Sequence, residues 1–373
     1  FATWILKRPV MLYMDRQDAV MGTRSRNASE TCVETAVTRD GIIRGRRIDT
    51  DFDGGAYYTN ASSVAMAYCK KLFRMYRVEN QTCHVRTFYT NTISGGACRG
   101  YGSPQAHAVT EVNLDQTANA IGMDPCEFRL KNVVHPMDED PTGGTNLGNA
   151  RIEECIRKAY GVGMACGAHG NGYKGAYPEF TNVRMTVHSD GSVEVQIGIH
   201  EQGCGTVMTM QQIAAEALHV DVYRIKVHEA DTFITPYDAA GTQASRVTYV
   251  CGRAVQKAGE QLLDKMKNAC VQMYHWDKDK ITANDGILRF EEEEKSYKQV
   301  ALDYELRCCR YMHTELEYEP PSNPGTYCCA FAEVRVDKYT GQTEVLDLLC
   351  VHDVGQVMNR TLSEGQVEGG AQM

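Results

Sequence analysis

The nine residues 97–105 place an arginine inside a glycine-punctuated turn that leads through a proline into a predicted helix. Glycines at 100 and 102 allow backbone conformations that other residues avoid, and they let a ligand approach the main chain closely. Pro104 suits the first position of a helix, whose free amide groups attract anions, and Arg99 adds a fixed positive charge beside them. The same residues also suit an ordinary strand-to-helix turn, so they do not by themselves distinguish a ligand-binding turn from a structural one.

Two later segments repeat this pattern of small residues before a helix. In His200–Thr206 a predicted strand ends, two glycines bracket Cys204, and a helix is predicted to begin. In Ala239–Arg246 small residues precede Ser245, which suits the N-cap of a long predicted helix. Each segment alone is compatible with a purely structural turn or cap. Three such turns together favour a large polyanionic cofactor held mainly by main-chain amides.

Composition narrows the class of protein. The 373 residues are 43% hydrophobic and 23% charged, which predicts a globular chain with two domains. A net charge of −9 argues against a nucleic-acid-coating protein. No apolar run is long enough to span a bilayer, and the chain start shows no signal-peptide pattern. We therefore expect neither a nucleic acid nor a membrane as partner.

The 15 cysteines are scattered singly or as adjacent pairs, and no Cys-x-x-Cys occurs. This spacing excludes the usual zinc-ribbon and ferredoxin-type sites. A chain of this size needs no disulfide stapling, so reduced thiols in a cytoplasmic protein are expected.

Predicted strands and helices mix without regular alternation, which indicates an α+β fold with mixed sheets. We expect domains at 1–135 and 151–373, joined by a Pro-, Gly-, Asp- and Asn-rich linker over 136–150. Phe290–Lys298 is expected to be a solvated surface segment. The predicted elements are a buried strand at 9–14, hairpins of 32–37 with 42–48, over 183–199 and of 327–336 with 343–351, a strand at 225–228, and helices at 105–121, from 124, at 151–160, at 206–220 and at 245–269.

The chain opens at Phe1 inside an apolar stretch and closes inside a helix-like segment, Glu364–Met373, without a stop signal. The sequence is therefore expected to be a piece of a longer polypeptide, or one part of a larger assembly.

Seven motifs follow one another along the chain, of which the eleven-residue stretch Gly122–Asn132 is the most diagnostic. They are Arg8-Pro9-Val10, Arg99–Gln105, Gly122–Asn132, the turns at 200–206 and 241–246, His352–Gly355 and Glu364–Gly370. In their order and spacing the chain resembles, over essentially its whole length, the molybdenum-cofactor-binding portion of the xanthine dehydrogenase and aldehyde oxidase family.

The resemblance implies a molybdenum hydroxylase built of two elongated cofactor-binding domains. In this family a molybdenum centre chelated by a pterin dithiolene, with or without a cytosine dinucleotide tail, hydroxylates an aldehyde or N-heterocycle with oxygen from water. Electrons then leave through [2Fe–2S] clusters to FAD, which are expected here on other segments or subunits. The assembly is compatible with a homodimer.

The resemblance also implies roles for residues. Arg99 matches the arginine beside molybdenum and is expected to be catalytic, while Tyr101 and Tyr173 match aromatic residues that face the substrate. No metal ligand is assigned, because the family's molybdenum takes no protein side chain. The implied cofactor-binding residues are Cys98, Arg99, Gly100, Gln202, Gly203, Cys204, Gly205, Thr206, Gln243, Ala244 and Ser245.

Departures from the family pattern limit these expectations. Ala67 aligns with an arginine that binds substrate in animal xanthine-oxidising members, which have Gln in place of Cys204. The family's Phe-Gly-Gly segment, with its acidic substrate-facing residue, is expected upstream of Phe1, and the catalytic glutamate is expected beyond Met373. The role of the catalytic glutamate is therefore not assigned to any glutamate within this sequence. The fragment alone is expected to be inactive and to lack the cofactor.

Several functions remain open on these grounds. We expect hydroxylation of an N-heterocycle such as a purine, with an aldehyde oxidoreductase on the same scaffold as the alternative. A catalytically silent cofactor-binding or assembly module is another alternative. A dinucleotide-binding oxidoreductase is disfavoured, because no Gly-x-Gly-x-x-Gly lies in a strand–turn–helix context.

Overall fold

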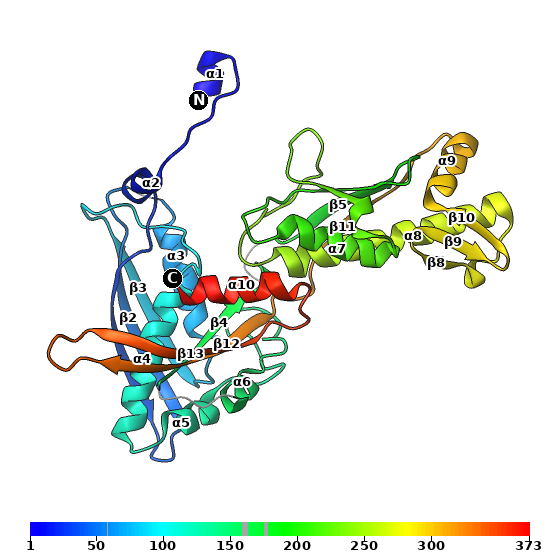
Figure 1. The fold of residues 1–373 in the computed structure, drawn as a ribbon. Coiled ribbons are helices and arrows are strands. Elements are labelled where there is room, and N and C mark those ends of the chain that lie inside the picture. The colour runs from blue at the N-terminus through cyan, green and yellow to red at the C-terminus, as the bar shows by residue number, and fades with distance from the viewer. Residues whose placement is uncertain (58, 159–162, 175–177) are drawn as a thin grey trace. The chain divides into compact units, whose positions relative to one another are not determined.

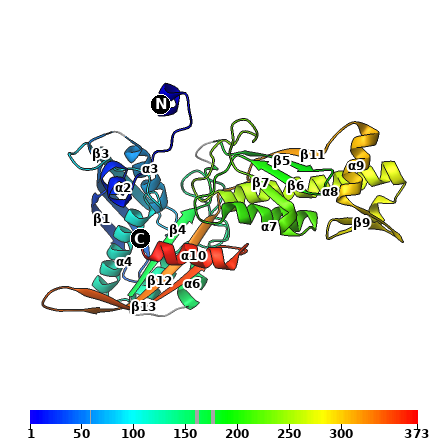
Figure 2. The same ribbon diagram turned by 45° about the horizontal axis from the view of Figure 1, so that its top comes forward.

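The computed structural model describes residues 1–57, 59–158, 163–174 and 178–373 (Figures 1 and 2). Its chain divides into two compact units that interleave along the sequence. The first unit contains Phe1–Pro136, Ala150–His169 and Tyr327–Asp353, and the second contains Met137–Asn149, Gly170–Thr326 and Val354–Met373. These units are defined by packing alone. The domains expected at 1–135 and 151–373, and the linker expected at 136–150, stay predictions.

The first unit is built around the three-stranded sheet β1-β2-β3. β1 (Ser29–Val37) and β2 (Ile43–Asp53) form the predicted antiparallel hairpin, and β3 (Asn80–Phe88) runs parallel to β2. The crossover between β2 and β3 is α3 (Ala61–Leu72), which lies with α4 (Ser103–Ala120) on one face of the sheet (Figure 1). Side chains alternate along the strands, so Ile48, Phe52 and their neighbours pack against α3 while the opposite face stays polar.

A second sheet of the first unit has the order β13-β12-β4. Its hairpin of β12 and β13 was predicted from the turn at 337–341 and is confirmed. The remaining elements of this unit are α1 (Ala2–Leu6), α2 (Arg16–Gly22), α5 (Pro125–Asn132), α6 (Ile152–Lys158), β4 (Gly163–Gly170), β12 (Gly325–Val336) and β13 (Thr343–Asp353).

The second unit packs two long helices against a four-stranded sheet of order β11-β5-β6-β7. Alternate residues of β5 and β6 are buried against α7 and α8, which cover one face of the sheet (Figure 2). A smaller sheet, β10-β9-β8, lies near the end of α8 (Figure 1). The elements are β5 (Thr181–Val187), β6 (Val193–Ile197), α7 (Thr206–Leu218), the 3-10 turn Val222–Arg224, β7 (Ile225–His228), the π-turn Val247–Cys251, α8 (Gly252–Tyr274), the 3-10 turn Lys278–Lys280, β8 (Thr282–Asn284), β9 (Ile287–Phe290), β10 (Glu293–Ser296), α9 (Tyr297–Cys308), β11 (Met312–Tyr318) and α10 (Arg360–Ala371).

The α+β prediction with mixed sheets is confirmed, as is the helix start at Asp124, whose carboxylate accepts from the amides of Cys126 and Glu127. The predicted strand at 9–14 is wrong. Those residues are exposed and pair with no strand, because an apolar run forms a strand only where a sheet edge receives it.

Two expected details at helix starts also differ. Pro104 occupies the second position of α4, since Gly102 is its N-cap. Ser245 is not an N-cap: its φ is +55°, and the π-turn that leads into α8 begins at Val247. Among the described residues, no helix combines the length and apolar character needed to cross a bilayer.

Candidate functional site

The turn before α4 is tightly wound in the left-handed backbone region. Gly100, Tyr101 and Gly102 have φ values of +92°, +43° and +91°. The amide of Tyr101 donates to the carbonyl of Cys98 at 2.9 Å, and that of Ser103 donates to Gly100 at 2.9 Å. A Cβ atom on Gly102 would lie 3.0 Å from backbone atoms of α3, so this position requires glycine for both conformation and space.

Polar atoms without a hydrogen-bond partner gather beside this turn. Arg26 uses one guanidinium nitrogen to bind the carbonyl of Arg99 at 2.7 Å, while its buried Nη1 has no partner. Gln105 donates to the carbonyl of Asn27 at 3.1 Å, while the buried Oε1 of Gln105 and Oδ1 of Asn27 also lack one. Buried polar atoms are normally hydrogen-bonded, so one donor and two acceptors left open around the Arg99 turn fit a polar ligand there. The Arg99 side chain is exposed and that of Tyr101 is half-buried.

The loop before α7 differs from the expectation that its amides await an external anion. The amides of Gly205 and Val207 both donate to the carboxylate of Glu201 at 3.0 Å. Burial acts to raise the pKa of Glu201, but the surrounding backbone N–H groups outweigh it and lower the pKa. Glu201 is thus an internal anion at this helix end, which the sequence analysis did not assign.

Gly205 also has to be glycine. Its φ is +79°, and an added Cβ would collide with Leu362 of α10, so α10 packs directly on this loop. Cys204 and Thr206 lie side by side, with Sγ and Oγ1 3.2 Å apart.

The second and third predicted loops are joined by hydrogen bonds around Thr242. Its hydroxyl accepts from the amide of His200 at 2.7 Å, and its carbonyl accepts from Gln202 Nε2 at 3.0 Å. Ala244 and Ser245 follow with φ values of +53° and +55°. Consecutive left-handed residues other than glycine are costly and tend to occur at functional sites. The structure therefore brings Gln202 together with the 239–246 loop.

A fully buried ion triad underlies that loop, and sequence reasoning missed it. Arg246 Nε lies 3.1 Å from Glu179 and Nη1 lies 2.9 Å from Asp238, with all three side chains at most 2% exposed. Glu179 also accepts from the amides of Tyr173 and Lys174 at 2.7 Å each. The triad thus orders both the strained loop and the half-buried Tyr173. Arg246 and the nearby Asp238 were visible in the sequence, but the distant partner Glu179 and the burial of all three side chains were not.

The predicted site residues fall in both units. Cys98–Tyr101 belong to the first, and Tyr173, Gln202–Thr206 and Gln243–Ser245 belong to the second. Within the described residues, no group of three or more His, Cys, Asp and Glu side chains has a metal-binding arrangement.

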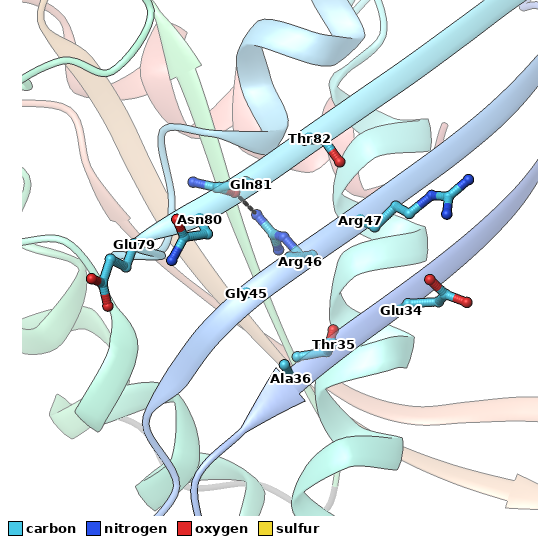
Figure 3. Close-up of a pocket in the computed structure, with 10 residues that line it drawn as sticks. All are labelled: Glu34, Thr35, Ala36, Gly45, Arg46, Arg47, Glu79, Asn80, Gln81 and Thr82. Atoms are coloured by element: carbon cyan, nitrogen blue, oxygen red, sulfur yellow. Dashed lines mark hydrogen bonds between the residues drawn. The ribbon is translucent and has the colours of Figure 1, made fainter.

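The hollow drawn in Figure 3 contains none of the predicted site residues. It is a shallow depression on the polar face of the β1-β2-β3 sheet above Gly45, flanked by residues such as Glu34, Arg47 and Asn80. The side chain of Arg46, at the same level, binds Gln81 Oε1 at 2.9 Å and the carbonyl of Leu72. Because Gly45 has no side chain and lies opposite short side chains, the hollow forms without any ligand to fill it.

Comparison with known proteins identifies the family. Models of the molybdopterin cofactor-binding domain match residues 1–133 and 145–373. The chain therefore belongs to the molybdopterin cofactor-binding domain family, and the predicted resemblance to xanthine dehydrogenases and aldehyde oxidases is confirmed.

The relatives include a putative xanthine dehydrogenase molybdenum-binding subunit of Escherichia coli K12, which is 31% identical over 98% of this chain and 52% of its own length. An aldehyde oxidoreductase of Megalodesulfovibrio gigas is 27% identical over 97% of this chain and 41% of its own length. The fold matches CO dehydrogenase from Oligotropha carboxidovorans with a TM-score of 0.86 and 23% identity, covering 99% of this chain and 52% of that one. The chain spans about half the length of these relatives.

Proposed function

We propose that this chain is the cofactor-binding part of a xanthine dehydrogenase-like molybdenum hydroxylase that acts on an N-heterocycle of the purine class. The observation that carries the proposal is the left-handed turn at Cys98–Ser103, which exposes Arg99 beside three unpartnered buried polar atoms. The family match over both parts of the chain supports it. We retain domains at 1–135 and 151–373, joined by a linker over 136–150, as a proposal.

The residues of the Arg99 turn fit the pterin cofactor in chemical type. A pterin offers both hydrogen-bond donors and acceptors, and the turn has an open donor in Arg26 and open acceptors in Asn27 and Gln105. When bound, the molybdenum–pterin group supplies the oxygen-transfer and two-electron redox chemistry. In the second unit, Glu201 already occupies the amides of Gly205 and Val207, so Gln202–Thr206 and Gln243–Ser245 would hold the remainder of the cofactor, including any nucleotide tail, through their other polar groups.

The protein residues bind and orient rather than perform the redox step. The guanidinium of Arg99 can stabilise negative charge that develops on a reacting oxygen, which is worth several kcal/mol in a water-excluded site. Tyr101 and Tyr173 can stack on a planar substrate and offer hydroxyl groups. In the second unit, the Glu179–Arg246–Asp238 triad fixes the backbone that carries Tyr173 and Gln243–Ser245.

Electron transfer requires partners, for which we propose subunits or domains with [2Fe–2S] clusters and FAD. The E. coli relative is described as a molybdenum-binding subunit, which supports an arrangement in several subunits. We also propose a cytoplasmic location, in keeping with the fifteen cysteines, among which the structure forms no disulfide within the residues it describes.

A second candidate function is an aldehyde oxidoreductase, favoured by the likeness to the M. gigas enzyme. Both candidates predict stoichiometric molybdenum in the intact protein, measured by mass spectrometry, and hydroxylation with oxygen from labelled water. Absence of both molybdenum and hydroxylation of any purine or aldehyde would leave only the assembly module.

The Arg99 assignment is tested by Arg99→Ala in the full-length protein, with Arg44→Ala as the control. Arg44 is also an exposed arginine and pairs with Glu79 on the first sheet. We expect Arg99→Ala to lower kcat/KM by at least a hundredfold with little change in melting temperature, and Arg44→Ala to change neither. An unchanged turnover with a sharply lowered melting temperature would mark Arg99 as structural.

A further inference from the structure

Lys71 reaches from the last turn of α3 to the carbonyl side of the Arg99 turn. Its Nζ donates to the carbonyl of Gly100 at 2.9 Å and to that of Tyr101 at 3.3 Å, and it lies 3.0 Å from Nδ1 of His169 on β4. An ammonium group has three N–H donors, and these are three acceptors. The hydroxyl of Ser103 lies 3.1 Å from the same His169 nitrogen, so the start of α4 joins the cluster.

We propose that Lys71 is a positioning residue whose ammonium group holds the turn that presents Arg99 and Tyr101, and that loss of its proton releases this turn. The proposal deepens the proposed function, because it adds a proton-dependent control to the turn assigned to the cofactor and substrate. Lys71 acts through the carbonyl groups of this turn, so it is a positioning residue and not a catalytic one.

The carbonyl groups it binds explain why a cation is needed there. Three consecutive left-handed residues wind the turn so that the carbonyls of Gly100 and Tyr101 both point toward α3. Left-handed backbone at a residue such as Tyr101 is strained and persists only where surrounding contacts hold it. One ammonium spanning two successive carbonyls supplies such a contact, and charge-assisted hydrogen bonds are about twice as strong as neutral ones.

The surroundings of Lys71 bring its titration into the neutral range. Burial, with a smaller contribution from the charge of Arg74, lowers the pKa of Lys71 to about 7. Burial likewise lowers the pKa of His169 to about 3, and it lowers the pKa of His107 on α4. Both histidines are therefore neutral near pH 7, and in the tautomer protonated at Nε2 His169 accepts a hydrogen bond at Nδ1. The charged and titratable groups that face Lys71 from α3, α4 and β4 are Arg74, His107 and His169, none of which is a carboxylate.

The number of N–H donors on Lys71 depends on its protonation state. Below pH 7 Lys71 has three N–H donors for its three acceptors. Above pH 7 the neutral amine has two, and its bonds to the carbonyls lose their charge assistance. The turn is therefore held at pH 6 and loosened at pH 8.5.

Global unfolding exposes Lys71 to water, whereas the proposed release of the turn leaves Lys71 buried on α3, so the two changes depend on pH in opposite directions. The unfolded chain binds a proton at Lys71 up to about pH 10.4, whereas the folded chain releases it near pH 7. Between these values the unfolded state binds more protons, so the contribution of Lys71 to folding stability rises with pH. Lys71→Met removes a buried charge and is expected to keep or raise the melting temperature at pH 6.

The test is hydrogen–deuterium exchange of the peptide covering residues 98–106 in the full-length protein at pH 6.0 and 8.5, corrected for intrinsic exchange. We expect at least tenfold greater protection at pH 6.0 in the wild type, and low protection at both pH values in Lys71→Met. Lys71→Arg keeps its charge above pH 8.5 and is expected to retain protection at both. Lys70→Met, one residue earlier on the same helix, is the matched control and should behave like the wild type.

Equal wild-type protection at the two pH values overturns the proposal, as does wild-type protection in Lys71→Met. If Lys71→Met fails to fold, the contrast between wild type and Lys71→Arg decides alone. In the active enzyme, the wild-type kcat/KM should fall above pH 7, and Lys71→Arg should move this limb above pH 9. Exchange needs neither molybdenum nor substrate. If protection of residues 98–106 falls between pH 6.0 and 8.5 but the enzyme shows no hydroxylase activity, only the proposed function is rejected. If the enzyme is an active hydroxylase but exchange does not change with pH, only the role of Lys71 is rejected.

Discussion

Replacing Arg246 with methionine tests whether the buried ion triad holds the second unit's loops. The guanidinium faces Glu179 and Asp238 with no exposed surface, so Arg246→Met leaves two buried carboxylates without their counter-ion. Removing one partner of a buried ion pair costs about 3–5 kcal/mol. Each carboxylate keeps two backbone donors, from Tyr173 and Lys174 or from Ala240 and Gly241. We therefore expect the lower end of that range, about 3 kcal/mol.

For a unit of 150–250 residues, a loss of about 3 kcal/mol lowers the melting temperature by roughly 6–12 °C. The assay is thermal and urea unfolding of the full-length protein, with Arg253→Met as the matched control. Arg253 is an exposed arginine of α8 that binds only the neighbouring Gln256 among the hydrogen bonds described. A loss below about 1 kcal/mol, or one equal to that of the control, would refute the reasoning from the triad.

Three further predictions concern the turns and the substrate. Gly102→Ala adds a methyl group 3.0 Å from α3 at a φ of +91°, whereas Gly122→Ala introduces the same kind of backbone strain, at a φ of +70°, in open space. Thermal unfolding should therefore show a larger loss of stability for Gly102→Ala than for Gly122→Ala. Equal losses of stability would contradict the packing argument. For Glu201, a lowered pKa means that its stabilisation is present above the unfolded value and disappears as pH falls through the folded value. Unfolding should therefore separate wild type from Glu201→Gln at pH 6, and the difference should shrink as pH falls through the folded pKa of Glu201, whereas a constant difference would disprove the role of the carboxylate. Among hypoxanthine, nicotinate and acetaldehyde, kcat/KM should be higher for a heterocycle, because Tyr101 and Tyr173, in their proposed substrate-facing roles, would stack on planar rings. An advantage of tenfold or more for acetaldehyde, about 1.4 kcal/mol, would reject this preference.

Local elements were predictable where residues at short range determine them. The hairpin of β1 and β2 follows from alternation around a glycine turn, and the start of α5 follows from an aspartate cap with a proline behind it. The strand expected at 9–14 failed for the opposite reason. Its residues have strand-like composition, but a strand needs a neighbouring edge, and sequence does not show which edges are available.

The start of α8 shows the same limit within the candidate site. Ser245 has the right chemistry for an N-cap, yet the interactions of Arg246 with Glu179 and Asp238 hold the preceding residues in left-handed backbone. The helical segment consequently begins at Val247 with a π-turn, and α8 itself begins at Gly252. A tertiary ion triad outweighed a local capping preference worth about 1 kcal/mol.

The sequence by itself determined the family, the α+β class and the three glycine-containing turns, because these depend on residues close together in the chain. Only the tertiary structure decided what fills the space around them. Glu201 occupies the amides before α7, Arg246 anchors the third loop, and Lys71 binds the carbonyls of the Arg99 turn. The partners in the last two contacts lie 29 to 67 residues apart. Their energies depend on burial, which raises the cost of an unpaired charge and changes its proton affinity, and burial is a property of the folded chain.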